Sequence, residues 1–514
     1  MFTIPPLSYN QRGVLLCLLS ALFLWLACCP FEQPLLGDRA YLAYMAQTVS
    51  RGEPLYQSTT FGYTPLAPLL GGGAIAAVQA LWPEVSSVSV LRWLGLLGYL
   101  AWVLSAYQLG QRVFIHSWQT YTLVFSVLSM GFVTLLATLN LEPKLLAVPL
   151  QLWAVLFALN QRWFWAGMLA SLALLTWQPM ALVGLVLGLF VLSQRQWKPL
   201  IPMALGALVG LIPLVGYLHV TEGWEAFVEN TWVRKTQQEA AQLGERPWAW
   251  LVWGVYPYFV TEIHLFLMSV LGLVFFAIHQ GKRGLAAAKR MLGKREHRLL
   301  GMLSGAWMVF NSLEFQSSPD LLPLLPLLLI SSVYALHRLR QGYPNPRIWW
   351  AFGLFLGFIS LADLIVYRPT LTYAKEKALF AKMEAQYGDP FVINFEAYYV
   401  VQERPLPTRY MRFAPHEDFF IYRQAGGCSG LVSQLQEKPP PAILFAEPQV
   451  PNGWEESCGY ALLNALVDKE AYQKVELNTN GWMGLPLPSP SASLRLYPIS
   501  SPWPAKGEAP LAFE

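Results

Sequence analysis

The sequence predicts a mainly α-helical protein that crosses a membrane many times and ends in a small external α/β domain. Of its 514 residues, 55% are hydrophobic and only 13% are charged, roughly half the charged share of a typical soluble domain. Mean hydropathy is +0.38. Long apolar segments recur up to residue 367, and the composition then becomes that of a soluble domain. These observations exclude a cytosolic enzyme, a disordered chain and a nucleic-acid-binding protein.

A membrane-spanning helix needs about 20 mostly apolar residues, and eleven segments are candidates, two of them short. They are 13–31, 91–111, 118–139, 145–160, 163–180, 181–194, 200–219, 257–278, 299–315, 320–337 and 348–367. The segment 65–82 is also uncharged, is rich in Gly and is flanked by Pro. Whether this segment crosses the membrane decides the topology.

The basic residues settle that choice, because Lys and Arg in short loops mark the cytoplasmic side. The loop 281–298 alone carries seven Lys and Arg against one acid, Glu296. The basic loops all fall on one side only if 65–82 does not cross. We therefore expect 65–82 to be a helix in the outer interface. The predicted topology has eleven crossings, a cytoplasmic N-terminus and an external C-terminal domain.

This topology divides the chain into a membrane domain, 1–367, and an external soluble domain, 368–514. The membrane domain contains a first external loop, a second large external loop and a basic cytoplasmic loop; they span 32–90, 221–256 and 281–298.

In the external domain, short apolar strands alternate with helices, which predicts a small α/β domain. The strands are 391–395, 442–447 and 493–499, and the helices lie near 373–387, 426–437 and 457–473. The Pro-rich segment 483–504 is typical of an extended tail. Cys428 and Cys458 both lie in this domain, and a disulfide and two free buried thiols are equally compatible with the sequence.

The first external loop holds the most informative pattern. From Asp38 to Arg51, apolar and aromatic residues recur at helical spacing, and Gly52 follows as a stop signal. Asp38 thus opens a helix near the membrane surface, where an ordinary helix cap is one interpretation.

Acidic residues also gather at the external ends of the predicted spans. They are Asp38, Glu142, Glu262, Glu314, Asp320 and Asp363. Acids can populate the outer side merely because bases populate the inner side. Six at one depth also favour a polar basin that opens outward.

A series of residues then carries a resemblance to a known family. An external acid, Asp38, is followed by tyrosines, small residues and a Pro-Leu pair; these are Tyr41, Tyr44, Ala46, Gly52, Tyr56, Pro65 and Leu66. This order resembles the C-type (GT-C) membrane glycosyltransferases, which include protein O-mannosyltransferases and lipid A aminoarabinose transferases. Arg92 in the second span, Glu142 as a second external acid and the Pro-Leu-rich segment 317–336 extend the likeness over most of the chain.

The sequence departs from that family at two points. Tyr63-Thr64-Pro65-Leu66 stands where the family often has His-Pro-Pro-Leu, and Ser317-Ser318 stands where it often has His-Tyr. These departures leave the identity of the donor and the acceptor open.

The resemblance implies transfer of a sugar from a polyprenyl phosphate to an acceptor hydroxyl on the external side, with inversion. Asp38 would be the general base. Glu142 would position the acceptor or, with Asp38, hold a divalent cation such as Mg²⁺ or Mn²⁺. Arg234, Lys235 and Arg39 would bind the donor phosphate. From the residues alone, Glu142 is equally a solvated helix-end acid, and Arg234 and Lys235 an exposed charged pair.

Two other classes of function are compatible with the sequence. One is a transporter or flippase of lipid-linked saccharides, and the other is a non-catalytic protein of cell-envelope glycan assembly. The acceptor of a transferase would be a lipid, a polysaccharide or a protein. We expect a bacterial plasma (inner) membrane, and the chain contains no Asn-x-Ser/Thr sequon.

Overall fold

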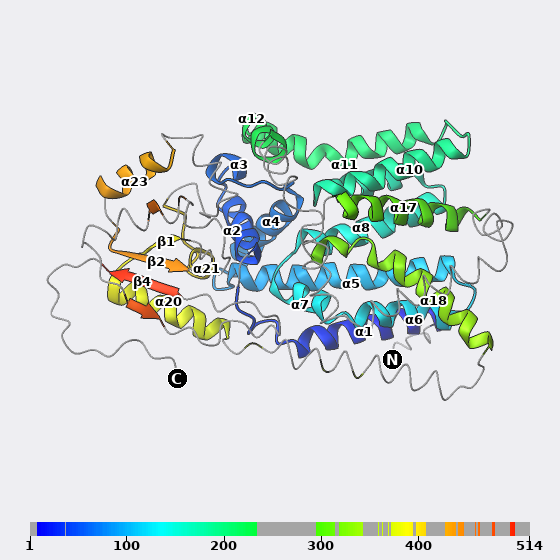
Figure 1. The fold of residues 1–514 in the computed structure, drawn as a ribbon, viewed down its shortest axis with the longest axis horizontal. Helices are drawn as coiled ribbons and strands as arrows, with labels where there is room; N and C mark the ends of the chain where they lie inside the picture. Colours follow the sequence, from blue (N-terminus) through cyan, green and yellow to red (C-terminus); the bar gives the residue numbers. More distant parts are fainter. Residues whose placement is uncertain are drawn as a thin grey trace.

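The computed structural model shows a bundle of long helices with an α/β domain at one end (Figure 1). It describes residues 8–35, 38–233, 294–313, 318–342, 372–393, 397–407, 427–437, 440–446, 475–477 and 494–498, with single residues at 358, 362, 369, 458, 461 and 462. We call the end of the bundle beside the α/β domain the outer end.

The described bundle helices run back and forth along one axis (Figure 1). They are α1 (Tyr9–Ala27), α5 (Ser87–Val113), α6 (Ser117–Leu128), α7 (Gly131–Leu139), α8 (Pro143–Leu159), α9 (Trp163–Leu174), α10 (Ala181–Ser193), α11 (Leu200–Val220), α17 (Arg295–Leu313) and α18 (Leu325–Gly342). The segment predicted as one span at 118–139 is a broken pair, because α6 and α7 meet at a bend of 58°.

Three of the described helices, α1, α5 and α11, are long and apolar enough to cross a membrane singly, and the α6–α7 pair would make a fourth crossing. Helices α4, α8, α9, α10 and α18 are apolar but shorter. The polytopic membrane architecture is therefore confirmed, while the count of eleven spans stays a prediction. The predicted span 257–278 lies outside the described residues, as does 348–367 except for two single positions.

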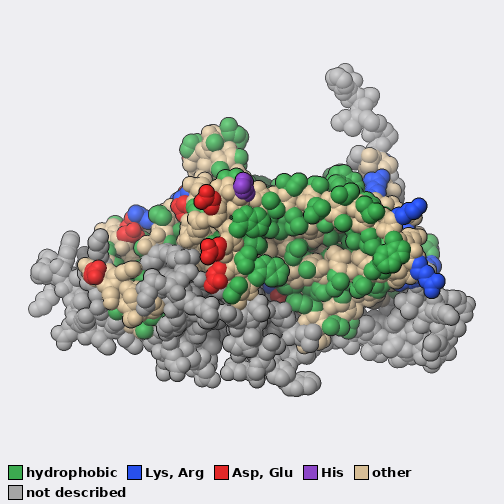
Figure 2. All heavy atoms as spheres, turned by 90° about the horizontal axis from the view of Figure 1, so that it is seen from above, with side chains coloured by type: hydrophobic (Ala, Val, Ile, Leu, Met, Phe, Trp, Pro, Cys, Tyr) green, Lys and Arg blue, Asp and Glu red, His purple; other side chains and the backbone are tan. Residues whose placement is uncertain are grey.

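Charged side chains are sorted along the bundle axis. Figure 2 shows a broad band of hydrophobic side chains, with only Lys and Arg among the coloured charges at the end away from the α/β domain, and with acids and some Lys and Arg at the other end. Arg162, Arg195 and Lys198 lie in turns at that basic end, between α8 and α11. This distribution agrees with the expected sorting of positive charge.

Helices α9 and α11 pack with their backbones in close contact. A Cβ atom added to Gly206 would overlap the carbonyl oxygen of Phe164, and one added to Gly167 would overlap that of Met203. Small residues allow such close packing between helices in lipid, where apolar burial between helices provides little driving force.

Three shorter helices lie across the outer end of the bundle: α2 (Asp38–Ser50), α3 (Leu55–Ser58) and α4 (Leu66–Leu81) (Figure 1). A Cβ added to Gly71 or Gly72 of α4 would overlap Ala46 or Val49 of α2. The expected helix at 65–82 is therefore confirmed, and it packs on the first-loop helix. Helix α12 (Trp224–Val228) and the π-helical turn η2 (Glu229–Val233) follow α11.

The external domain contains α20 (Tyr373–Tyr387), β1 (Phe391–Ile393), α21 (Ala397–Val401), α23 (Gly427–Glu437), β2 (Ala442–Ala446), β3 (Val475–Leu477) and β4 (Leu494–Pro498). Its sheet has the order β1-β2-β4-β3, with β1 parallel to β2 and the other pairs antiparallel. The three predicted strands are confirmed, and β3 is additional. The predicted boundary near residue 367 stays a prediction.

Cys428 and Cys458 are joined by a disulfide, with their Cα atoms 5.6 Å apart. This finding decides between the two alternatives that the sequence left open. The expected helix at 457–473 lies outside the described residues apart from 458, 461 and 462.

Candidate active site

The first external loop and the turn between α7 and α8 meet at the outer end of the bundle. The side-chain amide of Asn140 donates a hydrogen bond to the carbonyl oxygen of Arg39, at 2.7 Å. Arg39 is the second residue of α2, after Asp38, and Asn140 lies two residues before Glu142. One hydrogen bond therefore brings the backbones that carry Asp38, Arg39 and Glu142 together. The side chain of Asp38 lies outside the described atoms.

Glu142 lies at the N-terminus of α8 and is half-buried. Its N–H group donates to the carbonyl oxygen of Asn140, at 3.1 Å. Pro143 follows at the first helical position, and the Glu142 side chain makes no capping hydrogen bond to the helix. The positive end of the helix dipole favours a negative charge at this position.

A buried ion pair lies beside Glu142. Lys144 Nζ is 2.6 Å from Asp320 Oδ1, and the two side chains are 16% and 5% exposed. Asp320 belongs to the short 3₁₀ helix η3 (Ser318–Leu321), in the Pro-Leu-rich segment. The Lys144 ammonium also lies 4.9 Å from the centre of the Trp177 ring. The pair ties the segment before α18 to the first turn of α8.

Beneath this ion pair, aromatic side chains form a rigid layer. Trp177 and Trp307 stack with an interplanar angle of 7°, and Trp307 Nε1 donates to Gln151 Oε1 at 2.8 Å. The Gln151 amide in turn donates to the carbonyl oxygen of Pro323, also at 2.8 Å. Both Trp307 and Gln151 are fully buried. The layer fixes α8, α17 and the start of α18 under the candidate site.

The loop around Tyr63 is held in place by hydrogen bonds to its backbone groups. Leu66 N–H donates to Leu175 O at 2.8 Å, and the Gln178 amide donates to Gly62 O at 2.9 Å. The hydroxyl of Tyr56 donates to Tyr63 O, at 2.9 Å. Burial raises the pKa of Tyr56 well above its ordinary value, so this tyrosine stays neutral. Tyr56, one of the residues in the pattern that the sequence shows after Asp38, is thus buried and hydrogen-bonded to the backbone of this loop.

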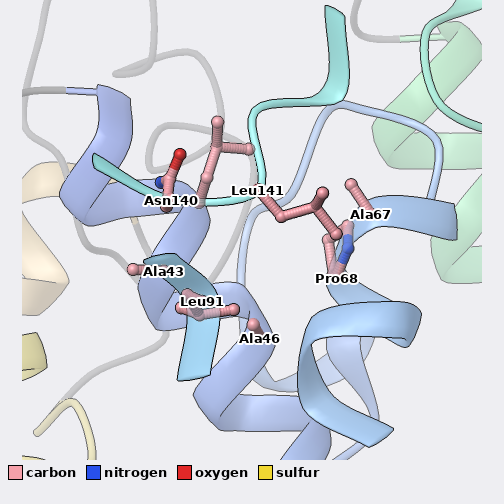
Figure 3. Close-up of a pocket in the computed structure, with 8 residues that line it drawn as sticks. Ala43, Ala46, Ala67, Pro68, Leu91, Asn140 and Leu141 are labelled. Atoms are coloured by element: carbon pink, nitrogen blue, oxygen red, sulfur yellow. The ribbon is translucent and has the colours of Figure 1, made fainter. Parts of the chain in front are cut away.

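A small apolar pocket lies between α2, α4, α5 and the Asn140 turn (Figure 3). Its lining residues are Leu42, Ala43, Ala46, Ala67, Pro68, Leu91, Asn140 and Leu141. In the sequence of α2, Asp38 comes four residues before Leu42, which lines this pocket. The Asn140 Oδ1 atom is buried and has no hydrogen-bond partner among the described residues.

The sequence-predicted site residues have different outcomes. The structure brings Arg39, Glu142 and the first residue of α2 together, and Arg39 is half-buried. Arg234 and Lys235 lie outside the described residues. Among the residues described, no group of three or more His, Cys, Asp or Glu side chains could hold a metal ion. Lys144 was not selected from the sequence; its only signal is its place two residues after Glu142 in an otherwise apolar run.

Comparisons with solved structures identify the fold. The chain is similar to ArnT from Cupriavidus metallidurans bound to undecaprenyl phosphate, with a TM-score of 0.59 and 14% identity, over 95% of this chain and 98% of that one. The apo state of the same ArnT gives a TM-score of 0.58 and 13% identity over the same shares. The apo oligosaccharyltransferase of Archaeoglobus fulgidus gives 0.50 and 12%, over 96% of this chain and 76% of that one.

No protein-family model matches the chain, and no curated protein matches its sequence. The structural likeness covers nearly the whole of both chains in the case of ArnT. The protein therefore has the GT-C fold of membrane glycosyltransferases, including both the helical bundle and the external domain.

Proposed function

We propose that this protein is a membrane glycosyltransferase that moves a sugar from a polyprenyl-phosphate donor to an acceptor hydroxyl on the external side of the membrane. The observation that carries the proposal is the hydrogen bond from Asn140 to Arg39, which brings the start of α2 and Glu142 together at the outer end of the bundle. The fold supports it, because ArnT, the protein of similar fold, has been crystallised with undecaprenyl phosphate bound.

In this proposal Asp38 is the general base. Its carboxylate takes the proton from the acceptor hydroxyl as the hydroxyl oxygen forms a bond to the anomeric carbon. The bond between that carbon and the phosphate oxygen breaks, and the lipid phosphate leaves with the bonding electrons. Attack opposite the leaving group inverts the anomeric centre. A correctly placed base contributes about 10²–10⁴ in rate.

The remaining candidate residues handle the acceptor and the phosphate. Glu142, beside the base at the positive end of α8, positions the acceptor hydroxyl. Arg39, Arg234 and Lys235 stabilise the charge that develops on the departing phosphate. Arg39 is the best supported of the three cations, because its backbone is hydrogen-bonded to the Asn140 turn.

The proposed reaction does not require a divalent cation, although one could assist it. Asp38 and Glu142 are the residues that would hold Mg²⁺ or Mn²⁺, and a bound cation would neutralise phosphate charge. The described residues offer no cluster of three or more ligands, so no step above depends on a metal. We place the enzyme in a bacterial inner membrane, with the α/β domain outside.

Purified protein in liposomes, supplied with a panel of polyprenyl-phosphate sugars, tests the proposal. The assay measures release of free polyprenyl phosphate together with transfer of labelled sugar. We expect Asp38→Asn to lower the rate by at least about 100-fold. Glu84→Gln removes an exposed acid of the same external region and serves as the matched control. If a folded Asp38→Asn variant keeps the wild-type rate, Asp38 is not the general base. If the wild-type protein releases polyprenyl phosphate from none of the donors, the protein is not a transferase of this kind.

A further inference from the structure

An acidic residue of the external domain is buried against the chain that leads to Asp38. Glu376, in the first turn of α20, has no exposed surface. Its Oε2 atom accepts a hydrogen bond from the N–H group of Leu35, at 3.3 Å, and its Oε1 atom has no partner among the described residues. Glu376 and Leu35 are more than 300 residues apart in the sequence, so this contact joins the two domains.

Arg92 holds the same segment from the membrane domain. This arginine is 1% exposed at the outer end of α5, and its Nη2 atom donates to the carbonyl oxygen of Gln33. Its guanidinium group lies 4.8 Å from the centre of the Tyr373 ring, and Tyr373 N–H donates to Glu32 O at 2.8 Å. The segment 32–35 is therefore held between α5 on one side and α20 on the other.

The external domain also contacts α2 beyond its first turn. The Gln47 amide donates to Val400 O at 2.9 Å and to Ser87 Oγ at 2.6 Å. The N–H group of Leu406 donates to the Tyr44 hydroxyl at 2.8 Å. Both ends of α2 are thus connected to the external domain, through the segment before the helix and through its last two turns.

The position of Leu35 limits the position of Asp38. Two residues separate them, and the three steps of extended chain from one Cα atom to the other span at most about 10 Å. Burying a carboxyl group and a guanidinium costs solvation free energy, and apolar residues of similar size would serve stability alone at least as well. Burial indeed raises the pKa of Glu376 to about 8, although the hydrogen bond from Leu35 and the charge of Arg92 act in the opposite direction. A polar group retained at such a cost indicates a need for a defined hydrogen bond.

We propose that Glu376 is a positioning residue of the transferase: its hydrogen bond to Leu35 fixes the segment that presents Asp38 to the acceptor. The inference rests on the proposed function. In this proposal a residue of the external domain contributes directly to the geometry of the active site. A base displaced by about 1 Å can lose about 100-fold in rate, and the loss appears in kcat because the base acts only in the transition state.

Three substitutions of Glu376 in the full-length protein separate the hydrogen bond from simple packing. Glu376→Gln keeps an acceptor oxygen for Leu35, Glu376→Leu removes it at similar volume, and Glu376→Asp keeps the carboxyl but falls short by one methylene. Glu384→Leu is the matched control, because Glu384 lies on the same helix and pairs with Arg404 instead.

We expect Glu376→Leu to lower kcat by about 10–100-fold with KM for the donor within about twofold. Glu376→Gln should retain nearly full activity, and Glu376→Asp should fall between them while remaining folded. A folded Glu376→Leu or Glu376→Asp variant with wild-type kcat, a loss confined to KM, or an equal loss in Glu384→Leu would overturn the proposal.

Hydrogen exchange of the 28–35 backbone amides gives a second readout that needs no substrate. The Leu35 amide should exchange at least about tenfold faster in Glu376→Asp than in wild type, whereas Glu384→Leu leaves it unchanged. Unaltered exchange would show that Glu376 does not hold this segment. If the wild type releases no polyprenyl phosphate from any donor, the proposed function fails, and the exchange result separately decides whether the segment is held.

Discussion

The Lys144–Asp320 pair offers a quantitative test of how the candidate site is held together. At an effective dielectric constant of about 20, unit charges 2.6 Å apart attract by roughly 6 kcal/mol, and desolvation of both groups offsets much of this attraction. Removing one partner from a buried pair costs about 3–5 kcal/mol. The contact of the Lys144 ammonium with the Trp177 ring remains after Asp320 is replaced, and it reduces that cost by about 1 kcal/mol. We therefore expect Asp320→Asn to lower the free energy of unfolding by about 3 kcal/mol.

A double-mutant cycle measures the interaction itself. Asp320→Leu, Lys144→Met and the double variant are unfolded at equilibrium in mixed micelles, where the free energy of unfolding can be compared with that of wild type. The double variant leaves no buried charge, so its loss should be smaller than the sum of the two single losses by at least about 1.5 kcal/mol. Additive losses would refute the reasoning, because they would show that the two charges do not stabilise each other.

Three further predictions concern other parts of the molecule. Because folding raises the pKa of Glu376 from 4.5 to about 8, the native state keeps a proton that the unfolded state has lost, so stability should fall as pH rises from about 4.5 to about 8. Glu376→Gln should flatten this profile in thermal unfolding scans; an unchanged profile would assign the dependence to other groups. Gly206→Ala should lower stability by about 3 kcal/mol or more, because the added methyl overlaps the Phe164 backbone. Gly216→Ala is the control, because a Cβ added there has open space; its size-exclusion profile and yield should match those of the wild type. Equal behaviour of the two variants would contradict the close packing of α9 and α11. Reduction of the Cys428–Cys458 disulfide, which closes 30 residues, should cost the external domain about 3 kcal/mol, seen as faster proteolysis of that domain.

The membrane architecture could be predicted from the sequence because its signals are strong and local. Apolar segments of spanning length and the one-sided placement of Lys and Arg depend only on neighbouring residues. The same charge argument gave the status of 65–82, which is α4 in the structure. The α6–α7 bend was not predicted, because Ser129 and Gly131 are the only signals of a break in the apolar run 118–139, and such residues also occur within continuous spans.

The candidate site was predictable only in part. Asp38 and Glu142 stand out as external acids, and a family resemblance selects them among six. The hydrogen bond between the backbones that carry them comes from the amide of Asn140, and nothing in the sequence distinguishes this residue from one in an ordinary helix-end turn. Lys144 and Asp320 are 176 residues apart, and no spacing rule relates them. β3 was missed because three residues are too few for alternation to be visible.

The contacts that the sequence could not reveal share one physical property: they join segments whose distance along the chain is large and whose side chains are polar. Hydrophobic patterning predicts which face of a helix is buried, but not which backbone amide a buried carboxyl will meet. Glu376 shows the consequence, because in the sequence it is one of two acids on a charged helix, while in the structure it has no exposed surface. The arrangement also connects the external domain to the first loop through several hydrogen bonds. If the segment before Asp38 depends on α20 for a hydrogen bond, truncation of the external domain removes more than a binding module. It leaves Leu35, Gln47 and Tyr44 without the partners that the domain provides. The start of α2 then loses its support on the side opposite Arg92, and the proposed base loses its fixed position even though every residue of the membrane domain remains.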